Sequence, residues 1–353
     1  AARLKGTGSV EVVPEEGKAF TVKGRSILLA TGSTPMEVPG LDFDGERIVN
    51  STEALAFDTV PKQLGVVGGG YIGLELGSVW MRLGAKVTVI EMLPKIATTL
   101  DGQVGRTLDR ILRKQGLAMR LNTRVKEAKP SGKKVKVTLE TDKGQENMTF
   151  DRLLVAVGRR PLTAGLGLEE QGVEMDPQTG HILVDASYRT NVEGIYAIGD
   201  LTPGPMLAHK ASAEGVAAVE CIAGRAGEVN YDTIPAVVYT WPEVAAVGLT
   251  EEEAKKRGIP YCVGTYPFSG AGRARCMGEK EGFVKLIAHG KTDRILGVHI
   301  IGPRAADMIA ECVLAMEFGA SSEDIARTIH GHPTFAEALQ EAALAVRKCS
   351  IYS

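Results

Sequence analysis

The order of apolar and polar positions along the chain predicts strands and helices that alternate. Residues 1–25 alternate apolar and polar positions around turns, as in a hairpin, and residues 26–33 form an apolar run typical of a strand ending in a turn. A strand, a helix, a second strand and an amphipathic second helix are then predicted at 63–68, 72–83, 86–91 and 103–115. This βαβα order predicts an α/β fold that contains a Rossmann-like domain.

The rest of the pattern divides into two parts. Strands are predicted around 135–139 and 153–157, and a further strand ends at Asp200 ahead of a helix over 210–223. After about residue 233 short strands alternate with longer helices. The strands are predicted at 237–239, 245–248, 283–288 and 295–301, and the helices at 304–318 and 334–346. That α+β composition predicts a separate C-terminal domain.

Composition narrows the class of protein. The 353 residues are 44% hydrophobic, enough to bury a sizeable core, and the formal net charge is -2. This balance gives no electrostatic footprint for nucleic acid, and no basic cluster or long apolar run indicates a membrane partner. The five cysteines show neither metal-site nor disulfide spacing: Cys221, Cys262, Cys276, Cys312 and Cys349. We therefore expect small-molecule partners, no metal and a reducing compartment.

A glycine motif lies between the first strand and the first helix of the Rossmann-like domain. Gly68-Gly69-Gly70-Tyr71-Ile72-Gly73 is G-x-G-x-x-G, and its place after a strand and before a helix makes the motif specific. Gly68 permits the tight turn, Gly70 lets backbone approach a pyrophosphate, and Gly73 lets helix and strand pack closely. A glycine turn that serves packing alone is the alternative interpretation.

An acidic residue follows where a dinucleotide site needs one. Glu91 ends the second strand, and its carboxylate can accept hydrogen bonds from the ribose hydroxyls. An NADP site would favour arginine near this strand end, whereas the next residues, 92–95, offer one lysine only. The motif therefore predicts NAD rather than NADP.

Five motifs in a fixed order carry a family resemblance. They are Ala30-Thr-Gly-Ser, Val67-Gly-Gly-Gly-Tyr-Ile-Gly-Leu-Glu-Leu-Gly, Ala156-Val-Gly-Arg-Arg-Pro, Ala197-Ile-Gly-Asp and His332-Pro-Thr-Phe-Ala-Glu. In this order the chain resembles the pyridine-nucleotide disulfide oxidoreductases over nearly its whole length. Pro205-Met-Leu-Ala-His and Glu75-Leu-Gly-Ser-Val-Trp resemble the dihydrolipoamide dehydrogenases of class I more than glutathione or mercuric reductases.

The resemblance implies a domain plan. It places a partial, discontinuous FAD-binding domain at 1–48 and 163–232, a Rossmann-like NAD-binding domain at 49–162, and an α+β dimerisation domain at 233–353. The last domain would bury its apolar helices against a second copy in a two-fold homodimer.

The resemblance also implies cofactor contacts for FAD and NAD. Gly8 would lie near the FAD adenine, Asp200 would hold a ribityl hydroxyl, and the remaining flavin contacts would be Thr31, Gly32, Ser33, Met206, Leu207, Ala208 and His209. For NAD, Glu91 would hold the ribose, Val125 would lie beside the adenine and Gly158 near the nicotinamide. The pyrophosphate and nicotinamide side would be lined by Gly68, Gly69, Gly70, Tyr71, Ile72, Gly73, Leu74 and Glu75.

His332 and Glu337 match the catalytic pair of the family, in which the histidine reaches the other subunit's flavin. An imidazole with an ordinary pKa of about 6.5 can remove a thiol proton near neutral pH, and a carboxylate on its other nitrogen raises its basicity. Pro333 is expected to help begin the helix that carries Glu337. Without the family, His-Pro-Thr would more often be a helix-capping turn. His330 is expected to pack at the interface, without a catalytic role.

The activity implied is FAD-dependent oxidation of dihydrolipoamide to lipoamide with NAD+ as acceptor. The partner would be a lipoyl domain of a 2-oxoacid dehydrogenase complex, in the mitochondrial matrix or the bacterial cytoplasm. The sequence departs from the family, because it shows neither the first G-x-G-x-x-G for the FAD pyrophosphate nor a C-x-x-x-x-C redox pair. We therefore expect a fragment that binds FAD weakly and is inactive alone. A truncated, non-catalytic protein that binds NAD or dimerises is the alternative.

Overall fold

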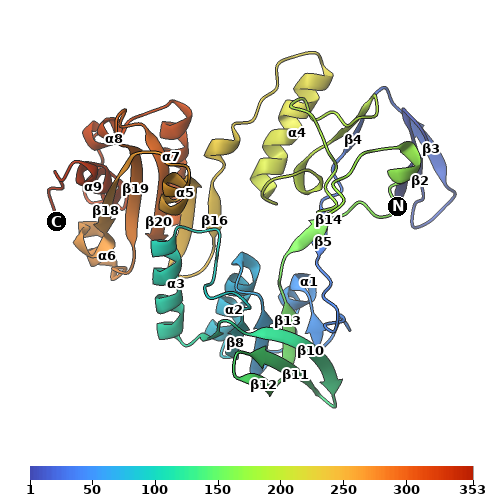
Figure 1. The fold of residues 1–353 in the computed structure, drawn as a ribbon, viewed down its shortest axis with the longest axis horizontal. Coiled ribbons are helices and arrows are strands. Elements are labelled where there is room, and N and C mark those ends of the chain that lie inside the picture. Colours follow the sequence, from blue (N-terminus) through green and yellow to red (C-terminus); the bar gives the residue numbers. More distant parts are fainter. Residues whose placement is uncertain (353) are drawn as a thin grey trace. The chain divides into compact units, whose positions relative to one another are not determined.

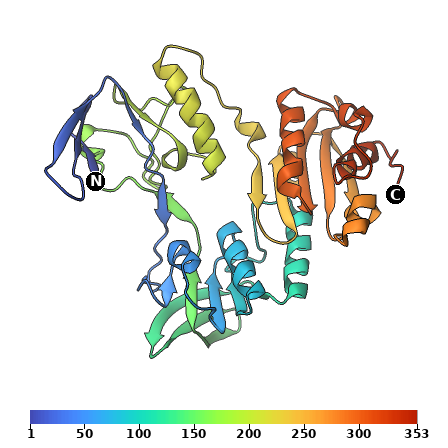
Figure 2. The ribbon, with the colours of Figure 1, turned by 180° about the vertical axis from the view of Figure 1, so that it is seen from behind.

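The computed structural model describes residues 1–352 and divides into two compact units (Figures 1 and 2). The first unit joins Ala1–Met36 to Gly158–Asn230, and the second joins Glu37–Val157 to Tyr231–Ser353. Within the described residues, no helix combines the length and the apolar character needed to cross a membrane.

The first unit is built from small sheets and one long helix. Residues 1–25 form a three-stranded antiparallel sheet, where a hairpin was expected, from β1 (Ala2–Leu4), β2 (Ser9–Val12) and β3 (Phe20–Lys23). The strand expected at 26–33 is divided in two by the turn at Gly32. Its parts are β4 (Ile27–Leu29), parallel to β15 (Ile195–Ala197), and β5 (Ser33–Pro35), antiparallel to β14 (Arg159–Pro161). The long helix is α4 (Ala208–Ile222), and short 3-10 turns η1 (Glu169–Gln171) and η2 (Gly199–Leu201) precede it.

The second unit begins with a parallel five-stranded sheet of order β6-β13-β7-β8-β9. Its strands are β6 (Ile48–Val49), β7 (Gln63–Val67), β8 (Lys86–Ile90), β9 (Ala118–Arg120) and β13 (Arg152–Val155). The accompanying helices are α1 (Ser51–Leu55), α2 (Tyr71–Arg82) and α3 (Gly102–Gln115). Asp101 caps the start of α3 and left-handed Gly116 ends it, which fixes the helix close to its expected range.

An antiparallel three-stranded sheet is inserted before β13. It consists of β10 (Arg124–Ser131), β11 (Lys134–Thr141) and β12 (Gly144–Phe150), of which only the centre of β11 was expected. Its outer strands carry many charged residues and expose one side to solvent, so their apolar alternation in the sequence is weak.

The C-terminal part of the second unit is an antiparallel sheet covered by helices. The order is β16-β17-β20-β19-β18, from β16 (Ala236–Val238), β17 (Glu243–Gly248), β18 (Tyr261–Pro267), β19 (Phe283–His289) and β20 (Ile295–Gly302). Between and after the strands lie α5 (Glu251–Lys256), η4 (Phe268–Gly270), α6 (Gly272–Met277), α7 (Ala305–Glu317), α8 (Ser322–Arg327) and α9 (Glu337–Val346). Helix α7 packs on β17 and β20, and α9 packs on β18 and β19 (Figure 1).

Helix α9 begins later than its sequence pattern indicates. The expected helix covers 334–346 with Pro333 at its start, whereas α9 begins at Glu337. The Thr334 amide donates to the Glu337 side chain and the Thr334 hydroxyl donates to the Gly331 carbonyl. Residues 334–336 therefore form a turn ahead of the helix, and Pro333 is not its first residue.

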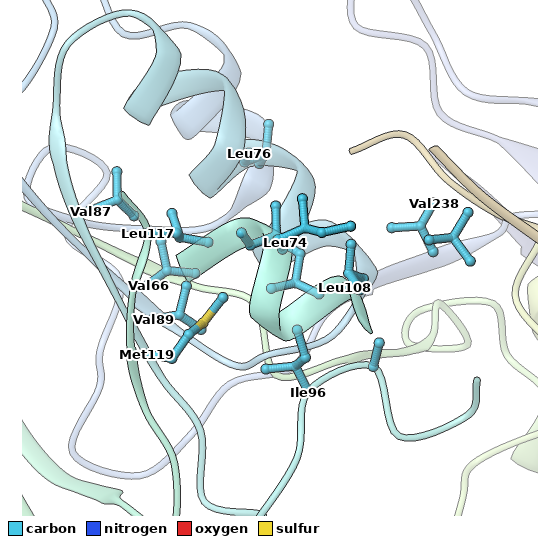
Figure 3. Close-up of a cluster of buried hydrophobic side chains, with 14 of the residues drawn as sticks. Val66, Leu74, Leu76, Val87, Val89, Ile96, Leu108, Leu117, Met119 and Val238 are labelled. Atoms are coloured by element: carbon cyan, nitrogen blue, oxygen red, sulfur yellow. The ribbon is translucent and has the colours of Figure 1, made fainter. Parts of the chain in front are cut away.

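One apolar core joins the parallel sheet to the C-terminal sheet. Figure 3 shows Leu74 of α2, Leu108 of α3 and Val238 of β16 in the same cluster of buried side chains. Val244 of β17 and Ile301 of β20 belong to it as well. The glycine motif and the C-terminal sheet are thus parts of one packed body.

Candidate active site

The three motif glycines serve different purposes. Gly68 has a left-handed φ of 106°, and a Cβ there would lie 2.4 Å from the Ala156 carbonyl oxygen. A Cβ on Gly73 would lie 2.2 Å from the Gly68 carbonyl oxygen. At Gly70, by contrast, no atom lies within 4 Å of an added Cβ. Close packing therefore requires the first and third glycines, and the middle one borders open space.

The N-terminus of α2 faces that open space. Gly70 is the N-cap and supplies no side-chain cap, so the first N–H groups of the helix are left for an anion. The hydroxyl groups of Tyr71 and Thr99 form a hydrogen bond of 2.8 Å. The Leu74 side chain is completely buried. Leu74 can therefore approach a dinucleotide only through its backbone.

Glu91 is bonded directly to the glycine turn. Its Oε2 accepts the Gly69 N–H at 2.6 Å and its Oε1 accepts the Leu93 N–H at 2.8 Å. The carboxylate is thus fixed beside the motif, with lone pairs left over for further donors. The open space at Gly70, the free N–H donors of the helix and the fixed acceptor oxygens of Glu91 together fit NAD.

Two other predicted NAD contacts, Glu75 and Val125, have their side chains in contact with other parts of the protein. Glu75 accepts the Tyr239 N–H at 2.8 Å. Burial raises the pKa of the Glu75 carboxyl and outweighs the opposite effect of that hydrogen bond. Val125 is buried in an apolar cluster with Val67 and Ile90, at the edge where β7 and β8 end. Gly158, the remaining predicted contact, belongs to the first unit.

In the first unit two of the predicted flavin contacts, Ser33 and Asp200, belong to one hydrogen-bonded network. The Ser33 hydroxyl donates to the Asp200 carboxylate, so the structure brings these two residues together. Arg159 donates to the Ser33 hydroxyl at 2.7 Å and to its carbonyl at 2.6 Å. The Thr31 hydroxyl donates to the Leu162 carbonyl at 2.8 Å. Sequence reasoning missed Arg159, although it belongs to the quoted motif that starts at Ala156.

A buried ion pair holds the turn that carries Asp200. Lys210 and Glu214 are one helical turn apart on α4, their charged atoms are 3.0 Å apart, and each side chain is 1% exposed. Glu214 accepts the Gly199 N–H at 2.7 Å and Lys210 donates to the Gly199 carbonyl at 3.1 Å. The pair therefore forms hydrogen bonds with both the N–H and the carbonyl of Gly199. Its spacing of four on a helix was the signal available in the sequence.

The other predicted flavin positions are backbone positions. Gly8 has a φ of 72°, and a Cβ there would lie 2.7 Å from the Gly24 carbonyl oxygen. Gly32 has a φ of 76° at the turn between β4 and β5. Met206 leads to Leu207, the N-cap of α4, and Ala208 and His209 are the first residues of that helix.

His332 and Glu337 meet at the start of α9. His332 Nδ1 lies 2.7 Å from Glu337 Oε1, and Glu337 Oε2 accepts the Thr334 N–H at 2.7 Å. The His332 side chain is 71% exposed, and the Glu337 side chain is only 15% exposed. Among the described residues, none hydrogen-bonds to His332 Nε2, so that nitrogen is open to a substrate. The carboxylate is thus fixed by backbone and orients an accessible imidazole.

Comparison with known proteins identifies the family. Residues 2–215 match the pyridine nucleotide-disulphide oxidoreductase model, and residues 234–343 match the dimerisation domain of the same family. The chain belongs to the pyridine nucleotide-disulphide oxidoreductases. Enzymes of this family are flavoproteins that use FAD and NAD(P), so the expected α/β oxidoreductase class is confirmed.

Individual relatives narrow the class. The chain is 51% identical to dihydrolipoamide dehydrogenase of Chaetomium thermophilum over 99% of its own length and 71% of the relative's. It is 50% identical to the mitochondrial dihydrolipoyl dehydrogenase of Pisum sativum, over 94% of the chain and 66% of the relative. The structure of LpdA from Mycobacterium tuberculosis matches with a TM-score of 0.89 and 27% identity, over 97% of this chain and 75% of that one. The chain is therefore a homologue of dihydrolipoamide dehydrogenases and spans about two thirds of the length of these relatives.

Proposed function

We propose that this chain supplies the NAD-binding, acid/base and dimerising parts of an enzyme that oxidises dihydrolipoamide to lipoamide with NAD+ as acceptor. The observation that carries the proposal is the His332–Glu337 pair, with Nδ1 on the carboxylate and Nε2 open. A glycine motif alone would fit many dehydrogenases. An accessible imidazole oriented by a carboxylate adds a group that can take a proton from a dithiol.

The protonation of His332 follows from its bonding. A carboxylate only accepts, so Nδ1 carries the hydrogen donated to Glu337, and the neutral ring has its lone pair on Nε2. Nε2 can take the proton of a substrate thiol, which leaves a thiolate able to attack the redox disulfide of such an enzyme. These 353 residues do not supply that disulfide, because their five cysteines are all free. The Glu337 carboxylate stabilises the imidazolium formed in that step.

The NAD site would use the glycine turn and Glu91. The free N–H groups at the start of α2 would hold the pyrophosphate, and the remaining lone pairs of Glu91 would accept the ribose hydroxyls. A 2′-phosphate would be repelled by this carboxylate, which supports NAD over NADP. Tyr71, Ile72 and Glu75 would border the same channel.

The flavin positions of the first unit would hold FAD. Asp200, fixed through Ser33 and Arg159, would accept a ribityl hydroxyl, and the residues from Met206 to His209 would pass beneath the ring system. When bound, FAD supplies the relay that passes an electron pair between the dithiol and the nicotinamide.

The proposal includes partners, domains and location. The lipoyl domain of a 2-oxoacid dehydrogenase complex would present the dithiol, and His332 would serve the flavin of a second copy in a homodimer. The domain boundaries remain those drawn from the sequence, at 48/49, 162/163 and 232/233. The mitochondrial name of the pea relative supports a matrix location for this chain, with a bacterial cytoplasm as the alternative.

The test is turnover by protein expressed from its own gene in its native host. Dihydrolipoamide-dependent NAD+ reduction is followed by the absorbance of NADH, in the parent and in H332Q, E337Q and H289Q. His289 caps a turn through Thr292 and serves as the matched control. We expect the rate to fall about 10²- to 10⁴-fold in H332Q, less in E337Q, and to stay unchanged in H289Q.

Two results would refute the proposal. One is a parent protein that binds NAD+ but shows no dihydrolipoamide-dependent reduction, which would favour a non-catalytic dimer. The other is an H332Q protein as active as the parent. Calorimetric titration of NAD+ into each variant separates loss of cofactor binding from loss of proton transfer.

A further inference from the structure

The segment between α8 and α9 turns the His330 side chain inward, two residues before the exposed His332. Ile329 is 95% exposed and the His332 side chain is 71% exposed, whereas the His330 side chain is only 5% exposed. The segment 328–336 therefore presents His332 to solvent while it inserts His330 into the protein. A buried imidazole two residues from an exposed one indicates different tasks for the two rings.

Both ring nitrogens of His330 lie on oxygen acceptors. Nε2 is 2.8 Å from Glu311 Oε1 on α7, and Nδ1 is 2.9 Å from the Thr328 carbonyl oxygen. A carbonyl and a carboxylate can only accept, and a neutral imidazole has one N–H to donate. Only the doubly protonated ring satisfies both contacts. His330 is therefore bonded as an imidazolium, whereas His332 keeps one nitrogen open.

We propose that His330 is a positioning residue, whose ion pair with Glu311 clamps the segment 328–336 to α7 and so holds His332 in place. The proposal rests on the proton-transfer role given to His332 above. The opposite side of the segment is tied to α9, because Glu337 accepts the Thr334 N–H and Gln340 donates to the Thr328 carbonyl at 2.9 Å. His332 thus lies between an anchor on α7 and an anchor on α9.

The charges around His330 favour its protonated form. The hydrogen bond that His330 donates to Glu311 raises the pKa of His330 and outweighs partial burial, which acts in the opposite direction. The charges of Glu311 on α7 and Glu337 on α9 and the Thr328 carbonyl at the end of α8 act in the same direction as that bond. Because the folded pKa is raised, the clamp is complete below the ordinary histidine pKa and is lost as the pH rises through the folded value.

The experiment uses the 353-residue chain and needs no turnover. Histidine-selective NMR gives the pKa of His330, and amide hydrogen exchange of Thr334 reports how often the segment opens. The variants are E311Q and H330Q. The matched control is D307N, since Asp307 lies on the same helix, is 74% exposed and pairs only with Arg304 in the described structure.

We expect the His330 pKa to exceed the ordinary value of about 6.5 in the parent and in D307N, and to fall in E311Q. Thr334 exchange should rise on the order of tenfold in E311Q and H330Q, as expected when a charged hydrogen bond is lost, and stay unchanged in D307N. The His332 ring resonances should shift or broaden in the same two variants.

Several outcomes would overturn the clamp. They are a parent His330 pKa at or below the ordinary value, or Thr334 exchange and His332 resonances in E311Q that match D307N. If E311Q does not fold, the parent protein alone tests the clamp. Its Thr334 amide exchange, corrected for hydroxide catalysis, must rise as the pH passes the His330 pKa, because the ion pair with Glu311 is then lost. Absence of dihydrolipoamide turnover would refute the proposed function and leave these measurements unaffected.

Discussion

Replacing Lys285 by methionine would test the ion pair that joins the parallel sheet to the C-terminal sheet. The Lys285 ammonium lies 2.8 Å from Asp101 and 2.6 Å from Glu251. Lys285 and Asp101 are buried, and Asp101 is also the N-cap of α3. Methionine keeps the length and apolar stem of the lysine, so K285M removes the charge with little change in packing.

The size of the effect follows from what K285M leaves behind. Asp101 would stay ionised and buried without its cation, and breaking a buried pair in this way costs about 3–5 kcal/mol. The hydrogen bonds from Gln103 and Glu251 amides still reach Asp101, which favours the lower end. In the double variant K285M/D101N no charge is stranded. We therefore expect D101N to recover part of the loss.

The assay is equilibrium urea unfolding followed by the fluorescence of Trp80, in α2, and Trp241, between β16 and β17. Lys114 provides the matched control, since it joins α3 to the loop before β19 by a 2.8 Å pair with Glu281. Both of those side chains are exposed, so K114M should lose at most about 1 kcal/mol. The free energies of unfolding are compared by linear extrapolation.

The loss in K285M should not depend on pH near neutrality. Burial opposes ionisation of Asp101, but the hydrogen bond and charge of Lys285 outweigh it and lower the pKa of Asp101. Burial likewise opposes the charge on Lys285, but Asp101 and Glu251 raise the pKa of Lys285. The pair therefore contributes in full between about pH 4 and pH 10, above the unfolded Asp pKa and below the unfolded Lys pKa. A K285M loss no larger than that of K114M, or one that vanishes at pH 7, would refute this reasoning.

The remaining predictions concern the glycine turn and a buried histidine. G70A should keep the parent's melting temperature but bind NAD+ about tenfold or more weakly by calorimetry, because its Cβ enters open space where a pyrophosphate would approach. G73A should unfold at clearly lower temperature, because its Cβ would overlap the Gly68 carbonyl oxygen, and equal melting temperatures for the two variants would contradict this distinction. Burial lowers the pKa of His299, and the bond to the Leu249 carbonyl does not compensate, so parent stability should fall as the pH drops below the unfolded value of about 6.5. Urea unfolding of H299Q should show a smaller decrease over the same range, and an identical slope would exclude His299 as the cause.

Local patterns predicted most elements but not all of their ends. The helix of the glycine motif and the helix after Asp101 begin within a residue of their expected positions, because apolar period and capping residues act locally. The sheet formed by β10 to β12 was largely missed, because most positions of its outer strands are exposed and polar or charged, and only a few, such as Val125 and Phe150, enter the apolar cluster. Helix α9 starts at Glu337 rather than at residue 334, and an apolar period does not locate the turn that precedes it.

The sequence by itself determined the family, the α/β class, the glycine turn and the identity of the His332–Glu337 pair. These features depend on residue type at short spacing, so they are visible without coordinates. The tertiary structure alone decided which distant groups share a site. It brought Lys285 to Asp101, Arg159 to Ser33 and His330 to Glu311, pairs that are 184, 126 and 19 residues apart in the chain. Partners at such separations depend on how sheets and helices stack, because burial and charge pairing are satisfied only after the chain has folded.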